Sequence, residues 1–205
     1  MKHLITESEI EQIALEILGN DLGYSVLYVP DIAEGHKKER EYSEVVLKQR
    51  LHKAIEKLNP SIPADAKEEA LKKVLRTTTI SLFENNQAFH QMLTEGIDVK
   101  FGIGEGKTKT DKVWLVDFAN PKNNEFIAIN QFTVIENHNN KRPDIVLFVN
   151  GLPLVVIELK NATDENANVK AAFNQLQTYK QLIPSLFTYN AFLIDRKSTR
   201  LNSSH

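Results

Sequence analysis

Apolar residues recur every three or four positions through most of the first half of the chain, a pattern typical of helices that bury one face. A capping box at Thr6 to Glu9 marks the start of the first helix. The glycines Gly19 and Gly23 are expected to end it before an apolar strand over 24–29. Further helices are expected over 44–58, 64–76 and 81–94, and together they predict a helical amino-terminal region.

Strand patterns dominate the second half. We expect strands over 97–101, 112–118 and 125–135, an apolar hairpin within 142–161, a helix over 165–182 and a last strand over 190–194. This order predicts an α/β fold with a mixed sheet flanked by helices. One domain is expected over 1–195, helical to about 95 and sheet-bearing from about 96. Residues 196–205, RKSTRLNSSH, look like a translated cloning scar and are expected to be a non-native tail outside this domain.

The apolar hairpin carries charges that need an explanation. Glu158 lies in an otherwise apolar strand, where a charge is costly unless it is paired or binds a metal. Side chains two apart on a strand share a face, so Glu158 and Lys160 are expected to project together. A Glu-x-Lys sequence alone is most often a surface ion pair, but here Pro143 and Asp144 open the preceding strand as well.

Whether Asp144 joins these residues depends on the register of the hairpin. A two-residue turn at Asn150 and Gly151 would place Asp144 opposite Ile157, on the wrong face. We therefore expect a three-residue turn over 150–152, with Gly151 in a left-handed conformation, which places Asp144 opposite Glu158. Two carboxylates about 4 Å apart repel by roughly 4 kcal/mol at an effective dielectric near 20, and a divalent cation would relieve this repulsion.

These acids and the lysine resemble the site of the PD-(D/E)xK nucleases. In the expected helix over 165–182, Gln175 and Tyr179 are four apart, share one face and match the Gln-x-x-x-Tyr element of one branch of these enzymes. The resemblance narrows to the amino-terminal nuclease domain of type I restriction enzyme R subunits. It rests on the runs FENNQAFHQMLTEG, NPKNNEFIAINQFTV, RPDIVLFVNGLPLVVIELKNA and FNQLQTYKQLIPSLFTYN, and it covers roughly residues 4–195.

The resemblance implies a restriction-endonuclease-like core that cleaves double-stranded DNA. Asp144 and Glu158 would bind the metal and Lys160 would orient or activate the attacking water, with Gln175, Tyr179 and Arg142 in support. Oxygen ligands in a chain without cysteine favour Mg²⁺, with Mn²⁺ as a substitute, over zinc. Glu44 and Glu84 are the candidates for a further acid from the helical region. The partners implied are methyltransferase and specificity subunits, with ATP and S-adenosylmethionine used only in the full assembly.

Two other functions remain open at this stage: a docking module that keeps the nuclease fold without activity, and a nuclease acting on single-stranded DNA or RNA. The complete set of two acids and a lysine speaks against the first. Only the family resemblance favours duplex DNA over the other polymers.

Composition and charge limit the function further. The formal net charge is −2, so nucleic acid would have to be bound by local basic clusters and not by bulk charge. The lack of cysteine, of a signal peptide and of an apolar run of membrane length indicates a cytoplasmic protein.

The segment 102–108, GIGEGKT, resembles a phosphate-binding loop only superficially. Its first glycine is misplaced, because Phe101 occupies the position where the motif needs glycine. We expect a strand after it, not the helix that a phosphate loop must open, so 102–111 is interpreted as a flexible hairpin tip without affinity for nucleotides.

Overall fold

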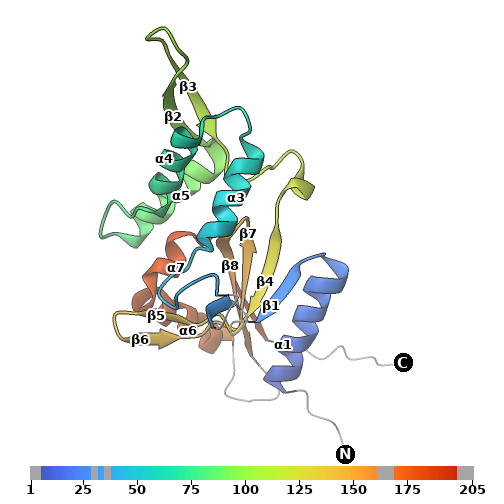
Figure 1. Cartoon of the computed structure of the whole chain (residues 1–205). Coiled ribbons are helices and arrows are strands. Elements are labelled where there is room, and N and C mark those ends of the chain that lie inside the picture. Colours follow the sequence, from blue (N-terminus) through green and yellow to red (C-terminus); the bar gives the residue numbers. More distant parts are fainter. Residues whose placement is uncertain (1–5, 29–31, 35–37, 161–168, 198–205) are drawn as a thin grey trace, which may run out of the picture.

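The computed structural model describes residues 6–28, 32–34, 38–160 and 169–197. Within these residues the main sheet has five strands in the order β1-β4-β7-β8-β9 (Figure 1). β1 is parallel to β4 and β8 to β9, whereas β7 is antiparallel to both of its neighbours. The strands are β1 (Ser25–Tyr28), β4 (Phe126–Asn130), β7 (Ile145–Val149), β8 (Leu152–Lys160) and β9 (Phe192–Lys197). The expected mixed sheet flanked by helices is confirmed.

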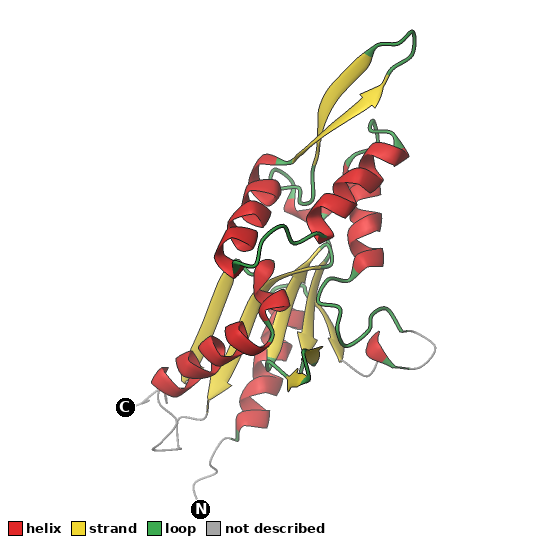
Figure 2. Cartoon of the chain, turned by 90° about the vertical axis from the view of Figure 1, so that its left-hand side faces the viewer, coloured by secondary structure: helices red, strands yellow, loops and turns green. Residues whose placement is uncertain are grey.

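Helices cover both faces of this sheet (Figures 1 and 2). On one face, α1 (Glu7–Glu16) and the π-helical turn η1 (Ile17–Asp21) pack Leu15 and Leu18 against Ile145 and Ile157. The expected capping box begins α1: Thr6 Oγ1 accepts from Glu9 N and Glu9 Oε2 accepts from Thr6 N. On the other face lie α6 (Val169–Leu182) and α7 (Pro184–Thr188), in a larger core that includes Val146 and Val156.

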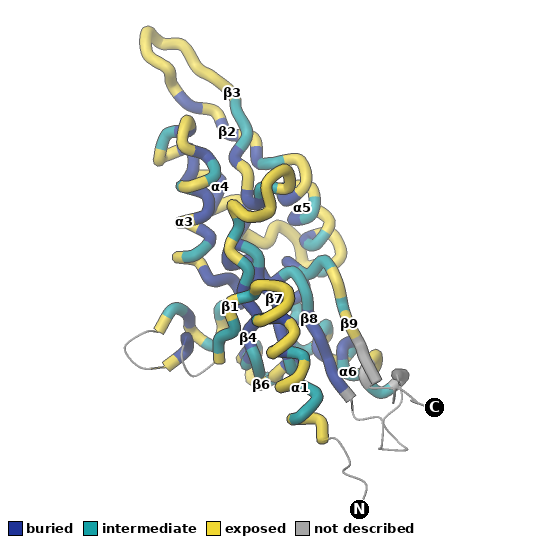
Figure 3. The backbone as a smooth tube through the Cα atoms, turned by 90° about the vertical axis from the view of Figure 1, so that its right-hand side faces the viewer, coloured by how far each residue is buried: buried dark blue, intermediate teal, exposed yellow. Residues whose placement is uncertain are grey.

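The larger core continues from the sheet into a helical region. Its helices are α3 (Lys48–Leu58), α4 (Ala64–Leu75) and α5 (Leu82–Glu95), and beyond them projects a hairpin of β2 (Ile97–Gly102) and β3 (Thr108–Val113). The outer half of this hairpin is exposed (Figure 3). A second hairpin, β5 (Val134–Glu136) and β6 (Asn139–Lys141), lies near α6, and the short 3-10 helix η3 (Pro121–Asn123) precedes β4.

Helix α3 begins at Lys48 and not at residue 44, so the start expected for the helix over 44–58 was wrong. The buried segment Val45 to Leu47 is not helical, and Leu47 N donates to Gly151 O at 2.9 Å. Val45 and Val46 are both β-branched and have low helix propensity, so their tertiary burial decides the conformation of this segment.

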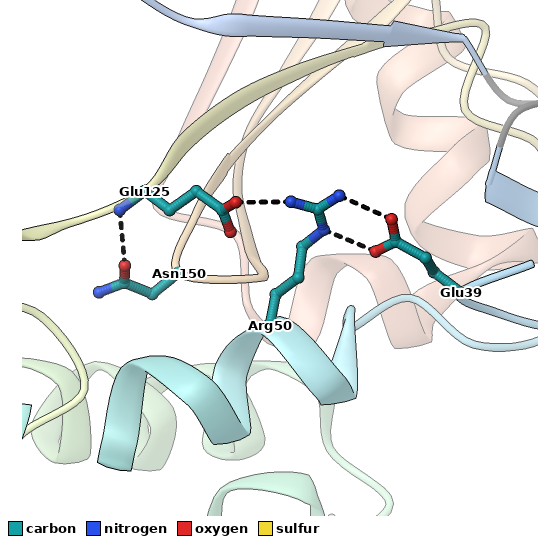
Figure 4. A network of polar contacts seen from close by, with 4 residues as sticks. All are labelled: Glu39, Arg50, Glu125 and Asn150. Carbon is teal, nitrogen blue, oxygen red and sulfur yellow. Dashed lines mark hydrogen bonds and ion pairs between the residues drawn. The ribbon is translucent and has the colours of Figure 1, made fainter. Parts of the chain in front are cut away.

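An ion-pair network fixes the start of α3 to the sheet (Figure 4). Arg50 donates to both carboxylate oxygens of Glu39 at 2.6 Å and to Glu125 Oε1 at 2.5 Å. Asn150 Oδ1 accepts from Glu125 N at 2.8 Å, which ties the network to the turn between β7 and β8. The two carboxylates also raise the pKa of Arg50, mainly through the hydrogen bonds that Arg50 donates to Glu39. The bidentate geometry is the strong form of this pair.

Two expected strands differ in the structure. The strand expected over 112–118 is instead β3, which ends at Val113, and Trp114 to Val116 continue as irregular backbone. Asn59 bonds both the N–H and the C=O of Trp114, and Asn150 Nδ2 donates to Leu115 O. These side-chain amides satisfy buried backbone groups that a strand would otherwise have to pair.

The strand expected over 125–135 is divided into β4 and β5. Gln131, with a φ of 54°, breaks it just after Asn130. The last strand begins at Phe192 and continues to Lys197, so it is longer than the expected 190–194 strand and includes Arg196 and Lys197 from the expected cloning scar. Residues 198–205 lie outside the described part of the chain.

The loop resembling a phosphate-binding motif leads into β3, as expected, and not into a helix. Gly104, Glu105 and Gly106 all have positive φ at the exposed tip. The absence of a following helix removes the dipole and the amide cradle that such a motif supplies. The expected lack of nucleotide affinity stays a prediction.

Candidate active site

The hairpin of β7 and β8 has the expected register, but the structural feature that sets the register is not the expected one. Its turn is a two-residue turn, with Asn150 at a φ of 52° and Gly151 at 83°, and Val149 pairs with Leu152. The expected three-residue turn is therefore wrong. A β-bulge after Leu147 then shifts the register, so that Leu147 pairs with Val155 and Ile145 with Ile157. Continued by one residue, this register places Asp144 opposite Glu158.

The bulge lies where the sequence permits it. Phe148 pairs with Pro153 and Leu147 with Val155, so Leu154 is the extra residue of β8. Proline has no N–H to give to a ladder, and within sheets it is found at edges and bulges. A bulge adds one residue to one strand and thereby shifts the pairing of every residue beyond it by one. This single residue returns Glu158 to the face of Asp144.

Asp144 is held in place by the neighbouring strand. Its Oδ2 accepts a hydrogen bond from Leu159 N at 2.7 Å, and its backbone C=O accepts from Gln131 N at 2.7 Å. A carboxylate has about four lone-pair sites, so this bond orients the group without using up its capacity as an acceptor. Asp144 is half-buried at the start of β7.

Glu158 is almost fully buried, with 1% of its surface exposed. It is two residues beyond Val156, whose side chain belongs to the larger core on the α6 face of the sheet. Removing an ionised carboxylate from water costs several kcal/mol unless a partner, a proton or a metal compensates. Its position at the end of an apolar strand therefore indicates chemistry more than packing.

Helix α6 presents a linked pair of side chains to the two acids. Gln175 Nε2 donates to Tyr179 Oη at 2.7 Å, as expected for residues four apart on one helical face. Tyr179 is buried, and desolvation raises its pKa to about 12, with smaller contributions from the negative charges of Glu158 and Asp144. The two acids and the two α6 residues thus share one neighbourhood.

An acid that sequence reasoning missed lies on α1. Glu11 is half-buried, and its Oε1 accepts from Gln131 Nε2 at 2.6 Å. Burial raises its pKa, and the negative charge of Asp144 raises it further, while the hydrogen bond from Gln131 and the charge of Arg142 lower it. No local pattern marks Glu11, because its hydrogen-bond partner Gln131 lies 120 residues away along the chain.

The two acids considered earlier have other partners. Glu44 accepts from Lys48 Nζ at 2.6 Å and from Glu41 N at 2.9 Å, and these contacts outweigh desolvation and lower its pKa. Glu84 is exposed in the first turn of α5, where Ser81 caps the helix. Of the three, Glu11 is the acid whose pKa responds to Asp144.

The structure gives the position of Arg142, one of the two basic residues expected at the site, but only the backbone of the other, Lys160. Arg142 is exposed, and its charge acts on both Glu11 and Tyr179, so it lies beside the acids. Lys160 is the last residue of β8, and its backbone pairs with Lys197 of β9. Its side chain lies outside the described part of the structure.

The chemistry of the acids suits one kind of cation best. Within the described residues, no group of three or more His, Cys, Asp and Glu side chains is close enough to hold a metal ion. The described acids therefore provide a pair. Magnesium is commonly held by one or two carboxylates together with waters and substrate phosphates, whereas calcium and zinc sites draw more ligands from the protein.

Comparisons with known proteins find similar sequences over nearly the whole chain. The family model described as "Type I restriction enzyme R protein N terminus" matches residues 5–204. The chain is 40% identical over 194 residues to the type I restriction enzyme HindI endonuclease subunit of Haemophilus influenzae, which covers 93% of this chain. It is 33% identical over 188 residues, 90% of this chain, to the "Putative type I restriction enzyme MjaIXP endonuclease subunit" of Methanocaldococcus jannaschii.

In both comparisons the chain spans 18% of the relative's own length. None of the helices in the described ranges combines the length and the apolar character needed to cross a bilayer.

Proposed function

The chain belongs to the family of type I restriction enzyme R proteins, as their N-terminal domain, and we propose that it is a metal-dependent endonuclease domain that cleaves double-stranded DNA. One observation carries the proposal. The register of β7 and β8 brings Asp144 and the buried Glu158 to the same face of the sheet, at the end of an otherwise apolar hairpin. Such a pair has little structural value without a cation.

Asp144 and Glu158 are the proposed ligands of Mg²⁺, with Mn²⁺ as a substitute. When bound, the cation would polarise the scissile phosphate and lower the pKa of the attacking water. Asp144 is oriented for this task by Leu159 N, and the buried strand holds Glu158 in position. Glu11 is proposed as a further acid of the site that does not itself bind the cation, because its half-buried carboxylate lies near Asp144 and is positioned by Gln131.

The remaining residues act on the phosphate and on the water. Lys160 follows Glu158 by two residues, and the family resemblance gives its amine the role of orienting the water and stabilising negative charge in the transition state. Tyr179, with a pKa of about 12, stays protonated at neutral pH and is proposed to position groups through hydrogen bonds and not to act as a base. Gln175 fixes the Tyr179 hydroxyl.

The wider reaction belongs to the assembly that the family implies. We propose that the domain works beside ATP-driven motors in the same subunit, with methyltransferase and specificity subunits that use S-adenosylmethionine. The relatives' much greater length leaves room for such motors outside the matched part.

The test measures cleavage and ATP hydrolysis side by side in the assembled enzyme carrying this domain. Asp144→Asn and Lys160→Ala should each reduce DNA cleavage by at least a hundredfold, while ATP hydrolysis continues at the wild-type rate. The control is Lys100→Ala, which removes an exposed lysine from the remote β2–β3 hairpin and should change neither rate.

Wild-type cleavage by the Asp144→Asn enzyme would refute the proposed site. A joint loss of cleavage and ATP hydrolysis in both variants would indicate a structural role for these residues instead.

A further inference from the structure

The β5–β6 hairpin leads directly into the candidate site. β6 ends at Lys141, and the chain then passes through Arg142 and Pro143 to Asp144. Beyond Glu136 the hairpin carries six consecutive side chains that can donate hydrogen bonds, with no acid among them: Asn137, His138, Asn139, Asn140, Lys141 and Arg142. Lys141 and Arg142 give this run a formal charge of +2.

The base of this hairpin is anchored to the body of the protein. Glu136 Oε2 accepts from Ser185 Oγ at 2.7 Å and from Ser185 N at 3.1 Å, at the start of α7. Ile135 N donates to Tyr42 O at 3.0 Å. The hairpin therefore lies in a fixed position near α6, the helix that faces the two acids (Figure 1).

The tip has a conformation that glycine would adopt more easily. Asn137 and His138 both have positive φ, 47° and 67°, as the two central residues of a type I′ turn require. Glycine is the usual second residue of such a turn, and a side chain in this region costs roughly 1 kcal/mol. An exposed histidine held there at a cost in stability suggests a function for its side chain.

The basic residues of the β5–β6 hairpin differ from those of the β2–β3 hairpin in their ion pairing. In the β2–β3 hairpin, Lys107, Lys109 and Lys112 form ion pairs with Glu105, Asp111 and Asp98 respectively. The side chains of Lys141 and Arg142, by contrast, form no hydrogen bond or ion pair with another side chain in the described ranges. Their charge is therefore available to an external anion beside the acids.

We propose that the β5–β6 hairpin is a DNA-binding element that holds the duplex against the candidate site, an inference that rests on the proposed function. Lys141 and Arg142 bind backbone phosphates next to the one that is cut. The tip side chains of Asn137 and His138 donate hydrogen bonds to the neighbouring groove or sugar edge. Two-stranded β-ribbons fit the grooves of duplex DNA, and phosphate contacts set the register of a protein on it.

The test uses the 205-residue chain and a short fluorescein-labelled DNA duplex, without divalent metal, so that binding is measured apart from cleavage. Fluorescence anisotropy gives the Kd at several salt concentrations. His138→Gly should raise the Kd about threefold to tenfold while the melting temperature stays the same or rises, since glycine suits the turn better. Lys141→Gln should lower the slope of log Kd against log salt by about 1.

The matched control is Lys109→Gln, which removes an exposed lysine of the other hairpin and should leave the salt slope unchanged. The proposal is overturned if the wild-type chain does not bind the duplex, if His138→Gly and Lys141→Gln bind like the wild type, or if Lys109→Gln weakens binding equally.

Failure of the proposed function would look different. Asp144→Asn would then still cleave in the assembled enzyme, whatever the hairpin variants do to binding. Conversely, if Asp144→Asn abolishes cleavage while the hairpin variants bind DNA like the wild type, the proposed nuclease site is supported and the proposed role of the hairpin is refuted.

Discussion

The position of Asp144 shows how a backbone hydrogen bond can prepare a side chain for chemistry. Leu159 N lies next to Glu158, and by donating to Asp144 Oδ2 it links the two acids through one peptide unit. Any shift between β7 and β8 would therefore disturb both carboxylates together. Preorganisation of this kind avoids the cost of ordering the ligands when the cation binds.

Glu11 offers a test at the level of a single residue. Glu11→Gln keeps the shape of the side chain and an acceptor for Gln131, but removes a charge that burial and Asp144 both disfavour. The free energy of unfolding should stay the same or rise slightly, while DNA cleavage by the assembled enzyme should fall at least tenfold. Urea unfolding and a cleavage assay measure the two effects.

Glu16→Gln is the matched control, because Glu16 is an exposed acid on the same helix. Equal cleavage rates for the Glu11→Gln enzyme and the control would show that Glu11 is not part of the active site.

Among the elements, the turn between β7 and β8 bears most directly on the site. Gly151 has a φ of 83°, and a Cβ atom added to it would lie 2.6 Å from Leu47 O and 2.9 Å from Leu51 N. Both contacts are with backbone atoms at the start of α3, which cannot move aside cheaply. The turn thus joins the helical region to the strands that carry the acids.

Gly151→Ala should accordingly lower the free energy of unfolding by about 2 to 3 kcal/mol, from the clash and the positive φ together. Gly104→Ala is the comparison: it also has a positive φ, 92°, but a Cβ there would meet nothing within 4 Å. It should cost about 1 kcal/mol. Urea unfolding of both variants gives the difference, and equal losses would show that the packing of the turn against α3 contributes little.

The local sequence patterns predicted the helices and strands better than they predicted how these elements pair and pack. The capping box at Thr6 and the placement of Gln175 and Tyr179 on one helical face follow from spacing along the chain, and the structure has both. The face of Glu158 was expected correctly, but for the wrong reason, because a bulge near Pro153 and not a longer turn sets the register. A bulge adds no apolar or polar signal of its own, so the pattern could not locate it.

The same limit explains the errors at larger separation. The segments 44–47 and 114–118 have apolar patterns that fit a helix and a strand, yet their backbone groups bond to Gly151 and to the amides of Asn59 and Asn150. Glu11 was missed because its contacts are with Gln131 and Asp144, far away in sequence.

At the scale of the whole molecule, the β7–β8 hairpin separates two regions. Its turn contacts α3 and the helical region, while its open end carries Asp144 and Glu158 about 15 to 20 Å away, the length of five extended residues. α1, β6 and α6 approach the open end from both faces of the sheet. The candidate site is thus assembled from segments spread over nearly the whole chain.

The most direct measurement for the central claim is anomalous diffraction from crystals of this chain soaked in manganese. The account predicts a manganese peak shared by Asp144 and Glu158, with carboxylate oxygens of both within about 2.0 to 2.6 Å of it. Crystals in which manganese binds elsewhere and neither carboxylate touches it, or in which the two carboxylates lie on opposite faces of the sheet, would contradict the account.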